Sequence, residues 1–205
     1  MLGLFALNAT GVQGSVLQMV NHGLSTGALF AMVGMLYERY HTRQIADLSG
    51  LAARMPWLAF FMVLFTFSSI GVPGLNGFAG EFLILIGTFQ RAWSDTSPPL
   101  TAQLVTVAVL AVSGVVLGAW YMLWFVQRVF FGPLKEPHDH GRPVIQDLSL
   151  REILALAPLA VFVVWIGIRP GDFLSRMQPT LELARRPAAA ALDHTQDHPE
   201  IARAR

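Results

Sequence analysis

Residues 56–90 are apolar almost throughout, and a cluster of glycine, proline and asparagine interrupts them near the middle. A helix needs about 20 residues to cross a bilayer, and this stretch runs well beyond that length. Glycine and proline interrupt the ladder of helical hydrogen bonds, so the stretch predicts a membrane helix over 56–90 that is broken at 71–80. The residues expected to form the break are Gly71, Pro73, Gly74 and Gly77.

One carboxylate, Glu81, follows this expected break. Backbone N–H and C=O groups freed at membrane depth are tolerated only where protein or a wet cavity satisfies them, so the break predicts an internal site. A carboxylate in the hydrocarbon region is unfavourable by a few kcal/mol, and such residues are usually functional and paired. The alternative is that Glu81 lies in an exposed re-entrant turn.

Charged residues lie between long apolar runs, whereas a soluble domain would scatter them. Hydrophobic residues make up 54% of the chain and charged residues 13%, which indicates an all-α integral membrane protein surrounded by the lipid bilayer. The absence of cysteine excludes a thiolate-held iron–sulfur cluster, a disulfide and a cysteine nucleophile. Arginine and lysine lie at the ends of the apolar runs, so no basic patch for nucleic acid is expected.

The apolar runs predict a bundle over 12–168 with about four complete spans. Residues 1–11 are expected to be the end of a truncated span and a turn from 8 to 11, so the chain is expected to be a fragment. Residues 169–205 are expected to form a polar tail that is partly disordered. The expected spans are 12–36, 56–90 with its break, 100–126 and 153–168.

The connectors 37–55 and 127–151 both carry basic residues. The positive-inside rule therefore places both on the cytoplasmic side, and places the short connector 91–99 on the opposite side. His138 and His140 lie in the second of these connectors and could suggest a metal. Two histidines in a solvated loop make a weak ligand set, so we expect no metal site.

Polar residues of the first complete span recur at steps of three and four, which places them on one helix face. They are Ser15, Gln18, His22, Ser25 and Thr26. This face is expected to be wet or to pair with other helices. His22 is either a titrating group or a neutral imidazole that is hydrogen-bonded for structure.

Two rows of small residues are expected to permit close helix packing. Gly23, Gly27 and Ala31 form the first row. Gly114 and Gly118 form the second and share a stripe with Tyr121, which is either a packing residue or a hydroxyl on a proton path.

Three segments carry a resemblance to a known family. They are NHGLSTGALFAMVGMLYERYHTRQIADLSGL at 21–51, GVPGLNGFAGEFLILIGTF at 71–89 and RVFFG at 128–132. Together they closely resemble the M subunits of proton-pumping NADH–quinone oxidoreductase, respiratory complex I, which are called subunit 4 in mitochondria. The resemblance runs from the first residue through the last span and fails only in the tail.

The resemblance implies an antiporter-like fold of two inverted repeats, each with one broken helix, of which this chain covers roughly the last two-fifths. It implies that Glu81 is the glutamate that ends a line of buried ionisable groups, where sister antiporter-like subunits carry lysine. It also implies that His22 links the central lysine of that line to Glu81. Ser25, Thr26 and Tyr121 are possible further members of the proton path. The central lysine and the ionisable groups of the first repeat are missing here, so this polypeptide alone could not complete the path.

The resemblance further implies a proton-translocating subunit whose driving energy comes from other subunits, in the inner, cytoplasmic membrane of a bacterium. No dinucleotide fingerprint or flavin motif occurs in the chain, so we expect no cofactor in it. NADH, flavin, iron–sulfur clusters and quinone are expected in partner subunits, which include sister antiporter-like subunits. Two alternatives remain: a subunit of a sodium/proton antiporter or membrane-bound hydrogenase of the same superfamily, and a membrane scaffold without catalysis.

Overall fold

The computed structural model describes residues 1–94, 98–137 and 145–197, and this part of the chain is helical with no named strand. The prediction of an all-α protein is confirmed. The α-helices are α1 (Leu2–Phe5), α2 (Ala9–Tyr40), α3 (Pro56–Ser69), α4 (Asn76–Ser94), α5 (Pro98–Phe130), α6 (Leu150–Ile168) and α7 (Gly171–Asp197), and two short 3-10 helices are η1 (Ile45–Asp47) and η2 (Leu51–Ala53).

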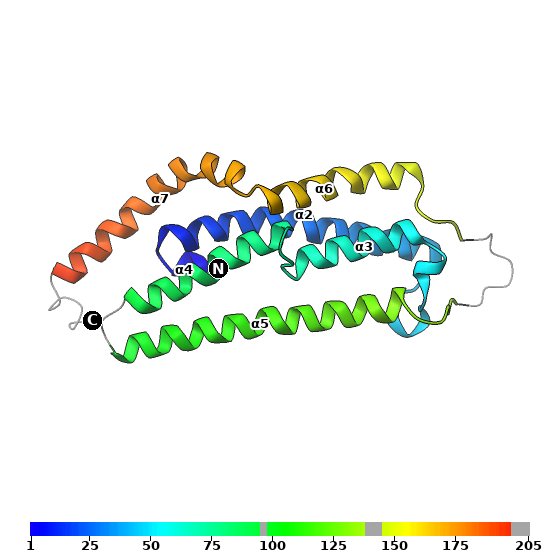
Figure 1. The fold of residues 1–205 in the computed structure, drawn as a ribbon, viewed down its shortest axis with the longest axis horizontal. Helices are drawn as coiled ribbons and strands as arrows, with labels where there is room; N and C mark the ends of the chain where they lie inside the picture. Colours follow the sequence, from blue (N-terminus) through cyan, green and yellow to red (C-terminus); the bar gives the residue numbers. More distant parts are fainter. Residues whose placement is uncertain (95–97, 138–144, 198–205) are drawn as a thin grey trace.

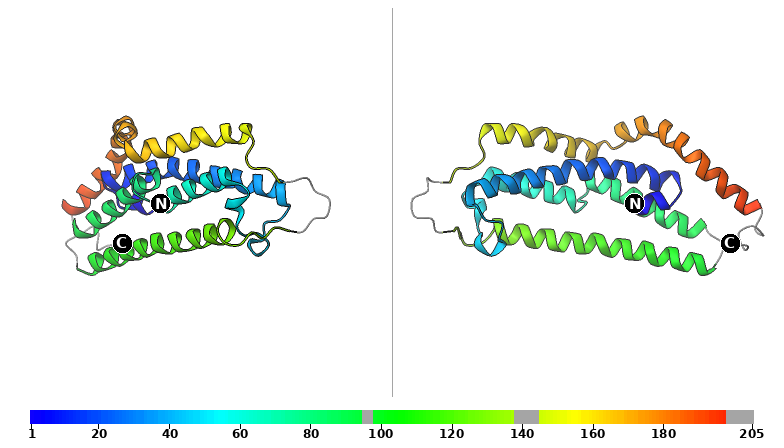
Figure 2. Two further views of the ribbon diagram at one scale, coloured as in Figure 1. Left: turned by 45° about the vertical axis from the view of Figure 1, so that its right-hand side comes forward. Right: turned by 180° about the vertical axis from the view of Figure 1, so that it is seen from behind.

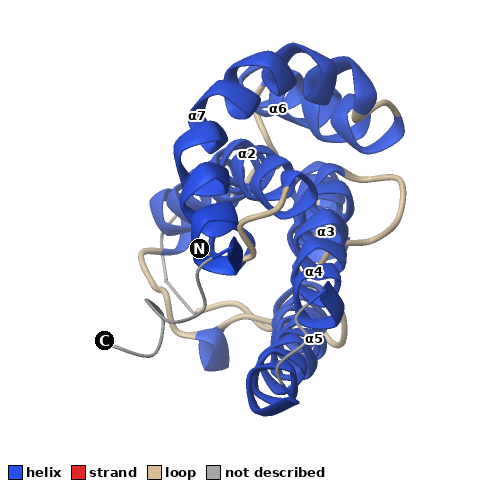
Figure 3. Cartoon of the chain, turned by 90° about the vertical axis from the view of Figure 1, so that its left-hand side faces the viewer, coloured by secondary structure: helices blue, strands red, loops and turns tan. Residues whose placement is uncertain are grey.

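Three of the described helices, α2, α5 and α6, are long and apolar enough to cross a membrane. The shorter apolar helix α3 continues into α4 across the break, and the pair runs between α2 and α5 (Figure 1). Seen along the helices, α6 lies at one edge, α2 and α3 form the middle, and α5 lies at the other edge (Figure 3). The chain is therefore a multi-pass membrane protein with one broken span.

The break covers residues 70–75, so the predicted bounds of 71–80 were wrong at the C-terminal side. Gly71 and Gly74 have positive φ values of 72° and 93°, which L side chains rarely adopt. Gly77 lies inside α4 instead, where a Cβ would overlap the carbonyl oxygen of Ser68. The composition pattern could not separate a glycine that breaks a helix from one that permits close contact.

The first complete span is longer than predicted, because polar residues cap both of its ends. Asn8 is the N-cap of α2, and its Oδ1 accepts a hydrogen bond of 2.8 Å from the backbone N–H of Gly11. The expected turn at 8–11 is therefore already helix. At the other end, His41 adopts the left-handed conformation with φ of 51° and closes the helix after Tyr40.

The last two spans and the tail also differ from their predicted bounds. Helix α5 runs beyond 100–126 at both ends. Helix α6 begins before the predicted residue 153, because Ser149 and Glu152 form a reciprocal capping box at its start. Residues 171–197 of the expected disordered tail form α7, which extends away from α6 (Figure 1). The alanine-rich composition of this segment favours helix, and that propensity was underrated.

Small residues bring α2 and α4 into close contact, but they are not the ones predicted. A Cβ at Gly14 would lie 2.7 Å from the Cβ of Leu83, and one at Gly87 would lie 2.5 Å from the Cα of Gly11. Gly23 and Gly27 have no such neighbour within 4 Å in the described part of the chain. The predicted row on α2 is therefore not a packing surface among the described helices.

The connectors that follow α2 and α5 meet at one end of the molecule, as the sequence predicted (Figures 1 and 2). Ser49 and Lys135 each donate a backbone N–H to the carbonyl oxygen of the other, with nitrogen-to-oxygen distances of 3.0 and 2.9 Å. Arg39, near the end of α2, forms a bidentate ion pair with Glu152 of α6, both contacts being 2.8 Å. The last residues of α4 and the first residues of α5 lie at the opposite end (Figure 1).

The segment before α6 contacts the start of α3, and the end of α6 contacts the break itself. At the start of α3, the Asp147 carboxylate, which precedes α6, accepts hydrogen bonds of 2.8 and 3.2 Å from the backbone N–H groups of Trp57 and Leu58. At the other end, Gly167 of α6 lies so close to the break that a Cβ there would overlap the carbonyl oxygen of Gly74. Between these points a buried apolar core joins α2, α3 and α6.

Candidate functional site

Glu81 lies in α4 just after the break, and the break itself positions its carboxylate. The side-chain amide of Gln18, on α2, donates a hydrogen bond of 3.2 Å to Oε1 of Glu81. The other oxygen, Oε2, faces Gly71, where a Cβ would lie only 2.6 Å away. The carboxylate is partly buried, and no cation pairs with it in the described part of the chain. The alternative of an exposed turn does not fit this placement.

A cavity of about 360 Å³ with many polar residues in its lining opens beside Glu81. It brings together all the candidate residues of the proton path, which come from three helices: His22, Ser25 and Thr26 of α2, Glu81 of α4 and Tyr121 of α5. Gln18 also lines it, whereas Ser15 of the same predicted face does not. Ser15 is instead buried, and its hydroxyl has no hydrogen-bond partner among the described residues.

His22 lies in this cavity without a hydrogen bond to Glu81 in the described structure. Its Nδ1 is 3.2 Å from the hydroxyl of Thr26, one helical turn further along α2. The residue that does contact the carboxylate is Gln18, which the sequence placed on the polar face but not in the site. Its position one turn before His22 on that face was the signal that could have identified it.

A buried hydrogen-bond network connects α2 to both sides of the break. The hydroxyls of Ser25 and Ser68 lie 2.5 Å apart, and Ser68 donates to Oδ1 of Asn76 at 2.5 Å. Asn21 donates its amide to the carbonyl oxygen of Asn76 at 2.7 Å. The carbonyl oxygen of Asn76, where the span restarts, thus has a partner on α2, whereas Oδ1 of Asn21 and the hydroxyl of Ser69 have none among the described residues. Sequence reasoning missed Asn21, Ser68 and Asn76 as members of the site.

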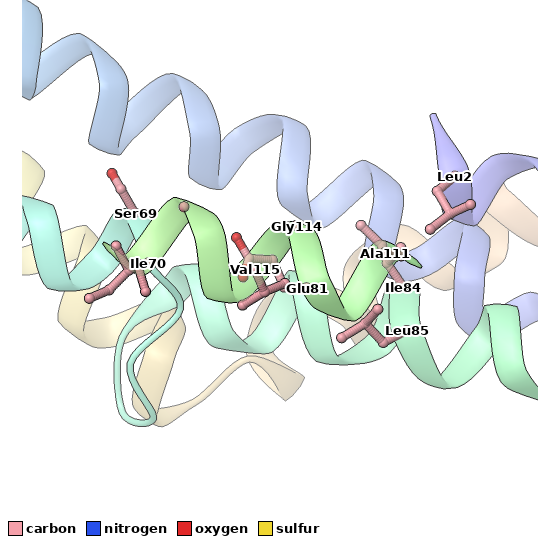
Figure 4. A pocket seen from close by; sticks show the side chains of 11 residues that line it. Leu2, Ser69, Ile70, Glu81, Ile84, Leu85, Ala111, Gly114 and Val115 are labelled. Carbon is pink, nitrogen blue, oxygen red and sulfur yellow. The ribbon is translucent and has the colours of Figure 1, made fainter. Parts of the chain in front are cut away.

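A second cavity, of about 310 Å³, lies between α4 and α5 and is mostly apolar. Glu81 and Ser69 line both cavities. Figure 4 shows Glu81 in this second cavity, with Ser69 and Ile70 on one side of it and Ile84 and Leu85 on the other. The carboxylate therefore lies at the boundary between a cavity with many polar lining residues and one with few.

Small residues of α5 form the facing wall of this apolar cavity. Among them are Ala111, Gly114 and Gly118. A Cβ at Gly114 or Gly118 would meet nothing within 4 Å in the described structure, so the prediction that these glycines serve helix packing was wrong for this part of the chain. Their missing side chains leave space beside Glu81 instead.

No group of three or more His, Cys, Asp or Glu residues that could hold a metal ion occurs within 1–94, 98–137 and 145–197. His138 and His140, which the sequence singled out, lie outside the described residues.

The fold and the site together define a helical, antiporter-like membrane protein in which a broken span presents a carboxylate to a cavity between helices. Residues 1–110 match the sequence model of the family described as NADH:quinone oxidoreductase/Mrp antiporter, transmembrane. The chain belongs to this family.

Individual relatives resemble the chain over most of its length. NADH-quinone oxidoreductase subunit M of Rhodobacter capsulatus is 42% identical over 181 residues, which are 88% of this chain and 32% of the relative. NADH-ubiquinone oxidoreductase chain 4 of Chondrus crispus is 39% identical over 176 residues, which are 86% of this chain and 33% of the relative. The chain thus spans about a third of the length of these relatives.

A solved structure shows the same fold. The structure of respiratory complex I from Thermus thermophilus with bound NADH contains a similar chain, with a TM-score of 0.67 and 32% identity. The match covers 90% of this chain and 36% of that one.

Proposed function

We propose that this chain is part of a proton-translocating subunit of an NADH–quinone oxidoreductase, in which Glu81 binds and releases a proton during the pumping cycle. The observation that carries this proposal is the place of Glu81 at the boundary of two cavities. A proton can reach a group at such a boundary through the polar side chains of one cavity. The apolar side chains of the other cavity can separate the group from the opposite side. Membership of the family supports the same role.

The side chains around Glu81 are suited to a carboxylate that binds and releases a proton. Gln18 donates to one carboxylate oxygen, so it orients the group without neutralising it. Because no cation compensates Glu81 within the described residues, its charge is free to respond to a cation brought near the cavity. The cavity of about 360 Å³ is lined by hydroxyl and imidazole groups that can relay a proton toward Glu81, from His22, Ser25, Thr26 and Tyr121.

The energy for pumping is proposed to come from partner subunits. NADH, flavin, iron–sulfur clusters and quinone would bind there, and this chain would carry no cofactor. The proposed partners are the other membrane subunits of the complex, including sister antiporter-like subunits. We place the complex in the inner, cytoplasmic membrane of a bacterium, because bacterial subunit M is among the relatives.

A second candidate is a subunit of an Mrp-type antiporter. It is favoured by the description of the matching family, which covers both kinds of protein. The two candidates differ in what drives proton movement: NADH oxidation in the first, and exchange against a cation gradient in the second. Proton uptake by vesicles supplied with either energy source separates them.

The decisive variant is Glu81→Gln in the complete membrane assembly. Glutamine keeps the size of the side chain and an acceptor for the Gln18 amide, but it cannot bind a transferable proton. The variant should assemble normally on native gels and lose most NADH-driven proton uptake in reconstituted vesicles, while Glu81→Asp retains part of it. Glu182→Gln, on the exposed surface of α7, is the matched control and should pump normally. Normal pumping by an assembled Glu81→Gln complex would overturn the proposal and favour a scaffold.

A further inference from the structure

A cavity of about 560 Å³ lies at the end of α5, where the two connectors meet. Gln127 and Arg128 of α5 line it together with Lys135, and Ser49 faces them from the segment between η1 and η2. It shares no lining residue with the two cavities beside Glu81. Its chemistry is therefore independent of the proton site.

Two cations in this cavity have no ion-pair partner among the described residues. The Arg128 guanidinium lies over the Trp124 ring, 5.4 Å from its centroid, and Lys135 donates through Nζ to the carbonyl oxygen of Ala46 at 2.5 Å. No carboxylate is among the described residues that line the cavity. Both cations therefore keep their charge available for an anion.

Two described carboxylates that neighbour lining residues in the sequence, Asp47 and Glu136, are engaged elsewhere. Asp47 accepts a hydrogen bond of 2.9 Å from Thr42. Glu136 accepts one of 2.6 Å from Tyr40 and pairs with Arg54 at 3.4 Å. Neither is positioned to neutralise Arg128 or Lys135.

The cavity also lies where a lipid headgroup would lie. Helix α5 is apolar along its length, and only 6% of its most apolar window is buried, so its surface is available to acyl chains. Trp124 and Phe131 border the cavity at the end of this apolar surface, as aromatic residues do at membrane interfaces. Basic pockets at such positions bind the headgroups of anionic lipids.

We propose that this cavity binds the phosphate of an anionic phospholipid headgroup, with Arg128 and Lys135 as the cationic ligands and the acyl chains lying along α5. The hydroxyl of Ser49 and the amide of Gln127 supply neutral hydrogen-bond donors from the same walls. This role goes beyond proton translocation and does not depend on it.

The test uses the membrane assembly that contains the full chain, delipidated in detergent and titrated with phosphatidylglycerol or with phosphatidylcholine of the same acyl chains. Native mass spectrometry measures retained lipid. Wild type should retain phosphatidylglycerol in preference to phosphatidylcholine. Arg128→Gln and Lys135→Gln should each weaken retention by about fivefold, because one cation near an anionic lipid surface contributes on the order of that factor. Lys135→Arg, which keeps the charge, should retain the lipid.

Arg43→Gln is the matched control. Arg43 lies in the connector at the same end and stacks on Tyr37, 4.8 Å from its ring centroid, but it does not line the cavity. This variant should bind phosphatidylglycerol as wild type does. Equal loss in Arg43→Gln would mean that the binding reflects general surface charge, and would overturn the site.

Three other outcomes also overturn the proposal. Equal retention of the two lipids by wild type would overturn the proposal, even if the variants fail to fold. Displacement of the lipid by inorganic phosphate at the same concentration would identify free phosphate as the ligand. Loss of a partner subunit from Arg128→Gln with unchanged lipid would identify an acidic protein segment as the occupant.

Discussion

Asn21 of α2 and Asn76 of α4 each donate a side-chain amide to the backbone carbonyl of the other, at 2.7 and 3.4 Å. Both residues are buried, with exposed fractions of 1% and 0%. Asn76 is the first residue of α4, so the exchange fixes the restart of the broken span against α2. Because Glu81 and Gln18 lie one or two turns away on the same two helices, this pair also sets their relative position.

We expect Asn76→Ala to destabilise the protein by about 1–3 kcal/mol, because it removes two buried hydrogen bonds, the one that Oδ1 of Asn76 accepts from Ser68 and the one that its amide donates to the carbonyl oxygen of Asn21. Thermal unfolding in detergent measures this as a lower midpoint. Ser94→Ala is the control, since it removes an exposed hydroxyl that donates to the carbonyl oxygen of Arg91 in its own helix. An unchanged midpoint for Asn76→Ala would show that the network does not hold the break.

Gly71→Ala and Gly74→Ala form a matched pair that separates backbone strain from contact with Glu81. Both glycines have positive φ, so alanine should be unfavourable by about 1–2 kcal/mol at either position. Only at Gly71 would the new Cβ approach the Glu81 carboxylate, whereas at Gly74 it meets nothing within 4 Å. Proton pumping per assembled complex should therefore fall in Gly71→Ala and stay near wild type in Gly74→Ala. A similar loss in both would assign the effect to strain alone.

His22→Gln tests whether the imidazole carries protons. Glutamine can keep a hydrogen bond with Thr26 but cannot titrate near neutral pH. If His22 is a relay, the variant should pump as slowly as His22→Leu, and Thr26→Val should pump faster than either. Vesicle proton uptake normalised to assembled complex gives the comparison. Near-normal pumping by His22→Gln would assign His22 a structural role.

The orientation of the chain in the membrane can be tested with single cysteines, because the native chain has none. Cysteines at Gln44 and Gln146 should react with an impermeant reagent only from the cytoplasmic side, and one at Ser94 only from the other side. Gln44 directly precedes η1, and the backbone carbonyl of Gln146 accepts a hydrogen bond from Arg39 near the end of α2, whereas Ser94 is the last residue of α4, whose end lies opposite (Figure 1). Labelling of Gln44 and Ser94 from the same side would contradict the broken span.

Stability should fall in acid through Glu136. Burial raises the pKa of this carboxyl, but hydrogen bonds from Tyr40 and Arg54 outweigh that effect and lower its pKa overall. A carboxyl whose pKa is lower in the folded state contributes stability that is complete above its unfolded pKa and is lost as pH falls through the folded value. The unfolding midpoint should therefore drop as pH falls below about 4.5, and Glu136→Gln should reduce that drop. Parallel curves for the two proteins would exclude Glu136 as the cause.

The sequence was sufficient to predict the all-α membrane class, the broken span and the carboxylate after it, because hydropathy and glycine–proline content act locally. It also placed His22, Ser25 and Thr26 on one face, which the structure turns toward Glu81. What it missed depends on distant partners. The start of α3, for example, is capped by Asp147, about 90 residues further along the chain, and no local pattern contains that contact.

The sequence also failed to predict where the helices end and which helix faces pack against another helix, because both depend on distant partners. Gly23 and Gly14 lie on the same helix, yet only Gly14 touches α4. Periodicity assigns both to a face but does not say which face another helix covers. Asn21 was missed because an amide inside an apolar span is recognisable as important only when its partner across the break is known.

The end of α6 at Gly167 packs against Gly74 and Leu75, where the break leads into α4, and this contact has a mechanical consequence. The segment before α6 is held to the start of α3 through Asp147. Helix α6 therefore spans the distance from the start of α3 to the restart of the broken span. Because a helix is stiff along its axis, a change in the angle between α3 and α4 must bend residues 70–75 or displace α6. Gly71 in that segment lies against Oε2 of Glu81, so even a small bend there alters the surroundings of the carboxylate.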